Sequence, residues 1–280
     1  MAGKLYVVAT PIGNLEDISE RAIRILKTSD IIAAEDTRVT RKLLSHFDIK
    51  TKLISYHQHS NETKAQYIIS RIKEGSNVAL VSDAGMPGIS DPGYELIKNC
   101  IDSNVDIQCI PGPCALINAL VLSGLSTSSF VFEGFLPRAK TQQQSYLRNL
   151  IDQPRTLVFY ESPHRLIKTL QNIYDVFGDR KIAVARELTK IYEQTIRGNI
   201  CEVISLLENR DIKGEIVIVV EGNMNQEKTA NDNENRVRKE IASLIKSGLS
   251  EKDAIKEVCK KLNISRNLAY SIALELKNNI

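Results

Sequence analysis

Two aspartates that could bind a positively charged ligand, Asp83 and Asp91, stand in the segment 82–93, which follows the apolar run Val78–Val81. Three glycines and two prolines exclude regular structure there, and glycine lets a ligand come close to backbone N–H and C=O groups. Two carboxylates suit a ligand that offers hydroxyls, an amine or another positive centre, and they repel phosphate. We expect a loop that binds a cation-bearing cofactor; the alternative is a plain tight turn.

The same segment does not fit the common phosphate-binding motifs. Gly88 and Gly93 have the spacing of a P-loop, but Tyr94 and Glu95 stand where that loop needs Lys and Ser or Thr. The chain contains no G-x-G-x-x-G motif, and its four histidines show no metal-ligand spacing. The motifs therefore point to neither a nucleotide phosphate nor a metal ion.

Two further Pro/Gly segments come directly after apolar runs. The first is Ala9–Leu15 near the N-terminus, and the other is Pro111–Ala115. Because ligands in α/β sheets bind at the carboxyl ends of strands, three such loops would line one edge of a sheet and form one cleft.

Apolar runs alternate with amphipathic segments over more than two hundred residues. The runs are Leu5–Ala9, Asp30–Ala34, Val78–Val81, Val105–Ile110, Phe130–Phe132, Thr156–Tyr160, Ile182–Ala185 and Ile216–Val220. This alternation predicts an α/β fold with largely parallel sheets. The small polar segment 123–129 is a candidate crossing between an N-terminal α/β domain, residues 1–122, and a second α/β domain, residues 123–222.

The end of the chain differs from the rest in composition. Residues 223–235 contain five asparagines and little to bury, which predicts a flexible linker. Residues 236–280 contain ten Lys or Arg and five Asp or Glu, and their apolar residues keep a helical period. Ser250 and Asp253 have the spacing of a capping box. We expect a basic all-helical module similar to a helix-turn-helix that contacts nucleic acid; the alternative is a packing or dimerisation cap with a solvated basic face.

Five cysteines at irregular spacing, with no C-x-x-C pair, indicate reduced thiols in a cytoplasmic protein. The chain shows neither a signal-peptide pattern nor an apolar run long enough to span a membrane, so we expect no membrane partner.

A set of longer motifs resembles the tetrapyrrole-methylase superfamily, and within it the members that methylate small-subunit ribosomal RNA. The motifs are Thr10–Leu15, Ala34–Arg38, Ser82–Gly93, Pro111–Pro113, Glu133–Pro137, Phe159–Ser162, Ala185–Lys190 and Lys213–Glu215. They occur in order over residues 4–222, and the C-terminal helices match the extra domain of those members. The resemblance implies two α/β domains with S-adenosylmethionine in the cleft between them, a homodimer, and methylation of a cytidine ribose 2′-hydroxyl in the decoding region of an assembled ribosomal particle.

The resemblance also assigns residues to the cofactor. They are Pro11, Asp83, Ala84, Gly85, Met86, Pro111, Gly112, Ala115, Tyr160, Leu188, Gly214 and Glu215. Met86 departs from the family pattern, which more often has a small hydroxyl residue at that position. Methyl transfer from a sulfonium requires no metal, so we expect none.

A ribose hydroxyl is a weak acid, so a carboxylate or a positive charge beside it would help methyl transfer. The candidates are Glu35, Asp36, Arg38, Arg186 and Glu187. The alternative is that these charges form a structural ion-pair network between the two domains. Two other functions stay open: methylation of a small corrin-type tetrapyrrole, and a non-catalytic RNA-binding role in ribosome assembly.

Overall fold

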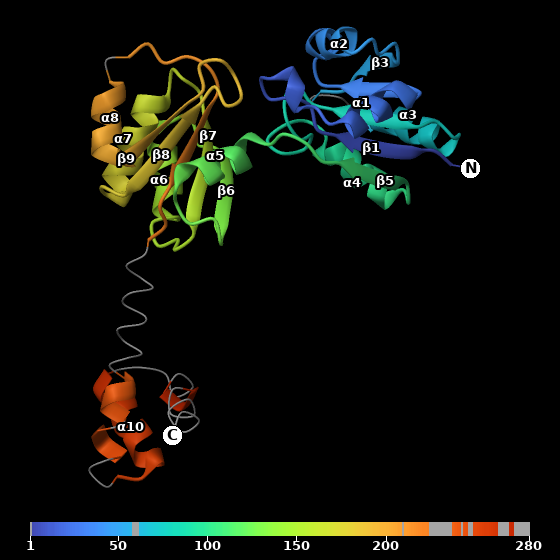
Figure 1. Ribbon diagram of the computed structural model, residues 1–280. Coiled ribbons are helices and arrows are strands. Elements are labelled where there is room, and N and C mark those ends of the chain that lie inside the picture. Colours follow the sequence, from blue (N-terminus) through green and yellow to red (C-terminus); the bar gives the residue numbers. More distant parts are fainter. Residues whose placement is uncertain are drawn as a thin grey trace. The chain divides into compact units, whose positions relative to one another are not determined.

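The computed structural model describes residues 2–57, 62–208, 210–223, 237–241, 243–245, 249–262 and 269–271 (Figure 1). The chain divides into two compact units. The first comprises Met1–Asn149 and Thr156–Glu221, and the second comprises Leu150–Arg155 and Gly222–Ile280. Apart from residue 223, the predicted linker lies outside the described residues.

The N-terminal half of the first unit contains a parallel five-stranded sheet in the order β3-β2-β4-β1-β5. Its strands are β1 (Lys4–Val8), β2 (Ile31–Ala34), β3 (Lys52–Ser55), β4 (Val78–Val81) and β5 (Asp106–Ile110). Helices α1 (Glu20–Thr28) and α2 (Thr37–His46) cover one face, and α3 (Glu62–Lys73) and α4 (Tyr94–Asp102) cover the other. Since both faces are covered, every residue of β2 and β4 is buried, which explains their continuous apolar runs.

The second sheet also has five strands, in the order β6-β7-β10-β8-β9. They are β6 (Phe130–Phe135), β7 (Thr156–Glu161), β8 (Lys181–Arg186), β9 (Gln194–Asn199) and β10 (Ile216–Val220). Only the β6–β7 pair is parallel, and the other three pairs are antiparallel. The prediction of largely parallel sheets is therefore confirmed for the first sheet and wrong for the second. The segment between β8 and β9 is too short for a parallel crossover, which needs about a dozen residues or more.

Helix α5 (Ala115–Ser123) follows the last strand of the first sheet but packs against the second sheet. Its Leu116, Ala119 and Leu120 join a buried cluster with residues of β7, β8 and β10. The remaining helices of this half, α6 (Lys140–Arg148), α7 (Leu166–Phe177) and α8 (Ile200–Leu207), lie together on the other side of the sheet (Figure 1). The domain boundary at residue 122 stays a prediction, and the packing of α5 shows that the chain reaches the second sheet before it.

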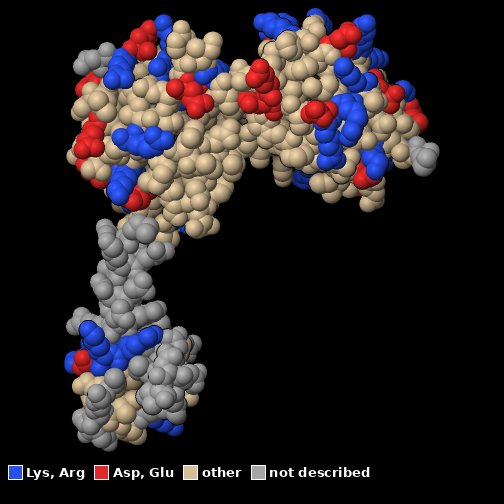
Figure 2. Space-filling model, viewed as in Figure 1, with Lys and Arg blue, Asp and Glu red and all other residues tan. Residues whose placement is uncertain are grey.

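The described residues of the second unit include helical segments at 237–241, 243–245 and 269–271 and helix α10 (Glu251–Leu262). A small buried cluster holds them together: Val237, Ile241, Ile255, Val258 and Ala269. The predicted cap is confirmed, because the Ser250 hydroxyl accepts a 3.2 Å hydrogen bond from the Asp253 N–H. Figure 2 shows Lys and Arg side chains grouped on the described part of this unit.

Candidate functional site

The predicted loops after β1, β4 and β5 meet at the carboxyl edge of the first sheet. The Thr10 N–H donates to the Gly85 carbonyl at 2.9 Å, and the Gly85 N–H donates back to the Thr10 carbonyl at 3.1 Å. Gly112 lies so close to β1 that an added Cβ would stand 2.8 Å from the Ala9 Cβ. Gly85 itself has a φ of +79°, which favours glycine. The convergence expected from the three Pro/Gly segments is therefore confirmed.

These loops form one wall of a cavity of about 210 Å³, and the second sheet forms the other; we call this cavity the crevice. It is lined by Ile12, Ala84, Gly85, Met86, Ile89, Ser90, Asp91, Cys114, Ala115, Phe135, Tyr160, Glu161, Glu215, Ile216 and Val217. The lining is mainly apolar, with carboxylates from Asp91, Glu161 and Glu215. A ligand that offers both apolar surface and a positive centre fits this set of groups.

Six of the twelve residues predicted to bind a cofactor line the crevice: Ala84, Gly85, Met86, Ala115, Tyr160 and Glu215. The other six, which are Pro11, Asp83, Pro111, Gly112, Leu188 and Gly214, are not among its lining residues. Pro11 and Asp83 are chain neighbours of lining residues, and Leu188 packs with Ile12 in the buried cluster below. Their assignment to the cofactor stays a prediction.

Nine other lining residues are not among the twelve that the resemblance assigns to the cofactor. They are Ile12, Ile89, Ser90, Asp91, Cys114, Phe135, Glu161, Ile216 and Val217. Asp91 is one of the two aspartates of segment 82–93 expected to face a positive ligand, and Phe135 and Glu161 stand in motifs that carry the resemblance. Ile216 and Val217 read only as strand residues, and no local signal marks them as lining.

The carboxyl of Asp91 in the crevice has a raised pKa. Burial raises its pKa to about 6, and the negative charges of Glu35, Asp83 and Glu215 act in the same direction. The hydroxyl of Ser82 opposes them by hydrogen bonding to the carboxylate. Carboxylates from both halves of the unit thus gather around this point, which makes it a favourable place for a positive charge.

The predicted catalytic residues after β2 lie beside this group. The Asp36 N–H donates to Asp83 Oδ1 at 3.0 Å, and the Asp36 carboxylate is held by the Arg38 guanidinium at 2.6 Å. This pairing lowers the pKa of Asp36. Burial raises the pKa of Glu35, and the charge of Asp83 adds to the effect. None of these three residues lines the crevice, and their catalytic role stays a prediction.

The other two catalytic candidates make structural contacts. Glu187 accepts from Lys190 Nζ at 2.9 Å and from the Glu215 N–H at 3.2 Å, and the Lys190 partner lowers its pKa. Lys190 in turn packs over Gly13 of the loop after β1. Arg186 donates through Nε to Gln194 on the neighbouring strand at 2.9 Å. These contacts agree with the ion-pair alternative for Glu187, and its catalytic role stays a prediction.

An aromatic group covers the second-sheet side of the crevice. The ring of Tyr160 meets Phe132 and Phe135 edge to face, with centroids 4.9 and 5.6 Å apart. Burial raises the pKa of the Tyr160 hydroxyl, so the side chain stays neutral. Phe135 is 57% exposed and lines the crevice, so its ring is available for stacking on a ligand.

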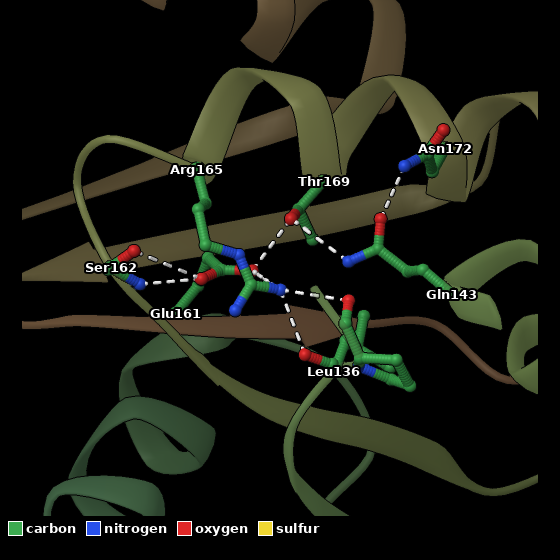
Figure 3. A network of polar contacts seen from close by, with 8 residues as sticks. Leu136, Gln143, Glu161, Ser162, Arg165, Thr169 and Asn172 are labelled. Atoms are coloured by element: carbon green, nitrogen blue, oxygen red, sulfur yellow. Dashed lines mark hydrogen bonds and ion pairs between the residues drawn. The ribbon is translucent and has the colours of Figure 1, made fainter. Parts of the chain in front are cut away.

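Glu161, at the end of β7, is fixed by a polar network (Figure 3). One of its oxygens accepts from the Ser162 N–H at 2.7 Å, and the other accepts from the Thr169 hydroxyl at 2.6 Å. Arg165 lies 3.3 Å from the same carboxylate and also donates to the Leu136 carbonyl at 2.8 Å. The guanidinium therefore ties the end of β7 to the end of β6.

The network continues into two helices. Gln143 on α6 donates to the Thr169 hydroxyl at 3.2 Å, and Asn172 on α7 donates to the Gln143 side-chain oxygen. All three of these side chains are buried, so the bonds satisfy polar atoms that water cannot reach. Helices α6 and α7 thereby hold Glu161, and the crevice wall beside it, in one position.

Among the described residues, His, Cys, Asp and Glu side chains form no group of three that could hold a metal ion. In the same part of the chain, every helix is too short or too polar to cross a membrane.

Comparison with known proteins agrees with the motifs. A family model for tetrapyrrole (corrin/porphyrin) methylases matches residues 4–204. The "Ribosomal RNA small subunit methyltransferase I" of Halalkalibacterium halodurans is 47% identical over 273 residues, which cover 96% of this chain and 94% of that protein. The chain belongs to the ribosomal RNA small subunit methyltransferase I family of tetrapyrrole methylases. The resemblance that the motifs indicated is confirmed.

Two other tetrapyrrole methylase comparisons are informative. The "Ribosomal RNA small subunit methyltransferase I" of Thermotoga maritima is 46% identical over 220 residues, which cover 79% of this chain but 99% of that protein. A crystal structure of uroporphyrin-III C-methyl transferase from Thermus thermophilus complexed with S-adenyl homocysteine superposes with a TM-score of 0.55. The matched region covers 78% of this chain and 97% of the other chain. The sequences are 18% identical there, so this likeness shows the fold alone.

Proposed function

We propose that this methylase transfers a methyl group from S-adenosylmethionine to the ribose 2′-hydroxyl of a cytidine in small-subunit ribosomal RNA. The observation that carries the proposal is the 47% identity, over nearly the full length of both chains, to a relative named as a small-subunit ribosomal RNA methyltransferase. The crevice gives the proposal its chemistry, because it joins an apolar lining to carboxylates that suit a positive centre.

The described residues fit this cofactor. Gly85 has a positive φ and no side chain, so its backbone is open toward the crevice. A Cβ added there would stand 3.4 Å from the Ile12 side chain. Phe135 and Tyr160 offer aromatic surface, and Asp91 and Glu215 offer negative charge. When bound, the cofactor supplies a methyl group that its positive sulfur has made electrophilic.

The protein's own contribution is alignment and electrostatics. The loops that Thr10 and Gly85 join are rigid, so they hold a bound molecule in one orientation without reorganising. The apolar lining from Ile12, Met86 and Ile216 excludes water from the reacting groups. The carboxylates favour a positive charge in the crevice, and one of them can accept the proton of a hydroxyl that enters beside it.

The second unit supports RNA as the substrate. Its sequence carries a surplus of basic residues, and positive side chains contribute salt-dependent affinity for phosphate. We extend the proposal to an assembled ribosomal particle as the form bound, to a homodimer as the active form, and to the cytoplasm as the compartment where this substrate is found.

The test uses purified protein and small ribosomal subunits from cells that lack it. We expect calorimetry to show S-adenosylmethionine binding, and labelled methyl to appear on a cytidine ribose of the subunit RNA. Labelling of a porphyrinoid and not of RNA would select tetrapyrrole methylation instead. Binding to subunits without any cofactor affinity would select a non-catalytic assembly role.

A further inference from the structure

Asp91 lies in the wall between two cavities. Next to the crevice is a second cavity of about 350 Å³, which we call the side cavity. Its lining includes Tyr56, His57, Tyr94 and Glu95 together with Ser90 and Asp91, and the last two also line the crevice. A group bound in the side cavity and a group bound in the crevice would therefore both lie against Asp91.

The backbone before Asp91 is held in an uncommon conformation. Ser90 has a φ of +60°, which is sterically unfavourable for a residue with a side chain. Its hydroxyl packs against Gly134, where an added Cβ would stand 3.2 Å away, at a point where the register of β6 shifts. Such strain is maintained where surrounding structure enforces it, and it concentrates at functional sites. The contact with β6 fixes Asp91 at the boundary between the two cavities.

The chemistry of the side cavity suits a nucleoside. Tyr94 is 62% exposed, and the ring of Tyr56 lies deeper in the same lining. Unstacked RNA bases stack on aromatic side chains, and a glutamate such as Glu95 can accept from the exocyclic amine of cytosine. Two carboxylates in the lining repel phosphate, so only the base and sugar of a nucleotide would enter.

We propose that the side cavity receives the acceptor nucleoside of the RNA and that Asp91 takes up the proton of its ribose hydroxyl. The inference rests on the proposed function and adds the base and the acceptor site to it. In the step, the hydroxyl oxygen bonds to the methyl carbon while the carbon–sulfur bond breaks. The electron pair of the broken carbon–sulfur bond stays on the sulfur, which becomes neutral. The proton passes from the hydroxyl oxygen to the Asp91 carboxylate.

Position distinguishes Asp91 from the other acidic residues nearby. Glu35 and Asp83 line neither cavity, Glu215 lines only the crevice and pairs with Lys190 at 3.5 Å, and Glu95 lines only the side cavity. The charges of Glu35, Asp83 and Glu215 act on Asp91, and the Ser82 hydroxyl is its hydrogen-bond donor. The other titratable groups that line the two cavities with it include Tyr160, His57, Tyr94 and Glu95. Burial and these charges raise its pKa to about 6, so it is ionised at neutral pH and still basic enough to take a proton.

The first experiment compares Asp91→Asn with Asp102→Asn, an exposed aspartate on α4. Methyl transfer to subunits should fall about 10²–10⁴-fold in kcat for Asp91→Asn only. Its Kd for S-adenosylmethionine, measured by calorimetry, should rise by no more than about tenfold, because Glu215 and Glu161 still offer negative charge, and the loss in kcat should persist at saturating cofactor. The kcat of the unmodified protein should decline below about pH 6, and the residual rate of Asp91→Asn should lack that decline.

The second experiment concerns the side cavity. Tyr94→Ala and Glu95→Gln should each raise the KM for subunits about tenfold without changing cofactor affinity, whereas the exposed Tyr174→Ala on α7 should change neither. A thermal unfolding curve for each variant checks that it folds.

Two results would overturn the inference while leaving the proposed function standing. One is full methylation by Asp91→Asn, and the other is a loss of cofactor affinity in Asp91→Asn that accounts for the whole loss of rate. If the KM for subunits is unchanged in both Tyr94→Ala and Glu95→Gln, the side cavity is not the acceptor site. Absence of methylation by the unmodified protein would instead refute the proposed function itself.

Discussion

Several residues at or beside the crevice adopt conformations or environments that lower the stability of the folded protein. Asp91 is partly buried among other carboxylates, Ser90 has a left-handed backbone, and Glu187 has a φ of +50° beside Gly214. Each of these costs folding free energy and persists because neighbouring contacts enforce it. Ser90 and Asp91 line the crevice, and Glu187 accepts from the N–H of the lining residue Glu215, which is the pattern expected where function, and not stability, selects the residue.

Asp91→Asn should stabilise the protein above pH 6. Native Asp91 holds its proton up to about pH 6, whereas the unfolded chain loses it near about pH 3.9, so the native state loses stability as the pH rises through that window. The full shift would correspond to about 3 kcal/mol, and solvent screening at this partly exposed carboxyl reduces it to about 1 kcal/mol. Urea unfolding at pH 8 and at pH 4 would measure it. Equal effects of the substitution at both pH values would contradict the prediction.

Gly214→Ala should destabilise the protein by about 2–4 kcal/mol. Gly214 has a φ of +90°, and an added Cβ would stand 2.0 Å from Glu187 Oε1. The glutamate would have to move, which breaks its bonds to Lys190 and to the Glu215 N–H. Gly178→Ala is the matched control, because that glycine also has a positive φ but has open space around it, so only the backbone cost applies. Similar unfolding midpoints for the two variants would show that the contact with Glu187 is unimportant.

Whole elements show which parts of the fold the sequence could predict. The buried strands β2 and β4 were visible as apolar runs, because both faces of a central strand need apolar side chains. The strands β3 and β9 were not predicted. Both are edge strands, and their partly exposed residues leave no continuous apolar pattern.

The site shows the same division. Clusters of Gly and Pro identify loops in a sequence, so the wall of the crevice that the first sheet's loops form could be predicted. The opposite wall comes from ordinary strand residues of β10, such as Ile216 and Val217, and only the three-dimensional arrangement of the second sheet brings them there. The network around Glu161 is partly local, since Ser162, Arg165 and Thr169 follow it closely in the chain, but Leu136 and Gln143 come from segments before β7.

Arg165 should be needed for the position of β6 relative to β7. Arg165→Ala leaves the Glu161 carboxylate, whose side chain is 1% exposed, without its cation and frees two carbonyls at the end of β6. The expected cost is about 2–4 kcal/mol, together with weaker cofactor binding, since Phe135 and Glu161 line the crevice. Urea unfolding and calorimetry would measure both. Arg21→Ala, at an exposed position of α1, is the control. If Arg165→Ala loses no more stability and cofactor affinity than Arg21→Ala, the role of Arg165 is refuted.

At the scale of the molecule, this chain is longer than some of its relatives. In the Thermotoga maritima relative, 99% of the length is matched by 79% of this chain, so a shorter protein carries the same family name. We propose that the basic C-terminal residues are an accessory part that helps to capture a large substrate.

Deletion of residues 223–280 should therefore weaken capture of ribosomal subunits and reduce its dependence on salt, because fewer phosphate contacts release fewer counterions. Affinity for S-adenosylmethionine should stay within about threefold, since every residue that lines the crevice comes before the deletion. Binding measured between about 50 and 200 mM salt tests the first part, and calorimetry tests the second. A collapse of cofactor affinity on truncation would show that the modular organisation is wrong.

The packing of α5 has a practical meaning for anyone who wishes to express this enzyme as two complementing polypeptides. A break at the polar segment 123–129 would leave α5 on the fragment that lacks the sheet it covers, exposing Leu116 and Leu120 to solvent. A break within 111–114 keeps the helix with its partners. Fragments divided there should reassemble on mixing, whereas fragments divided after the helix should aggregate.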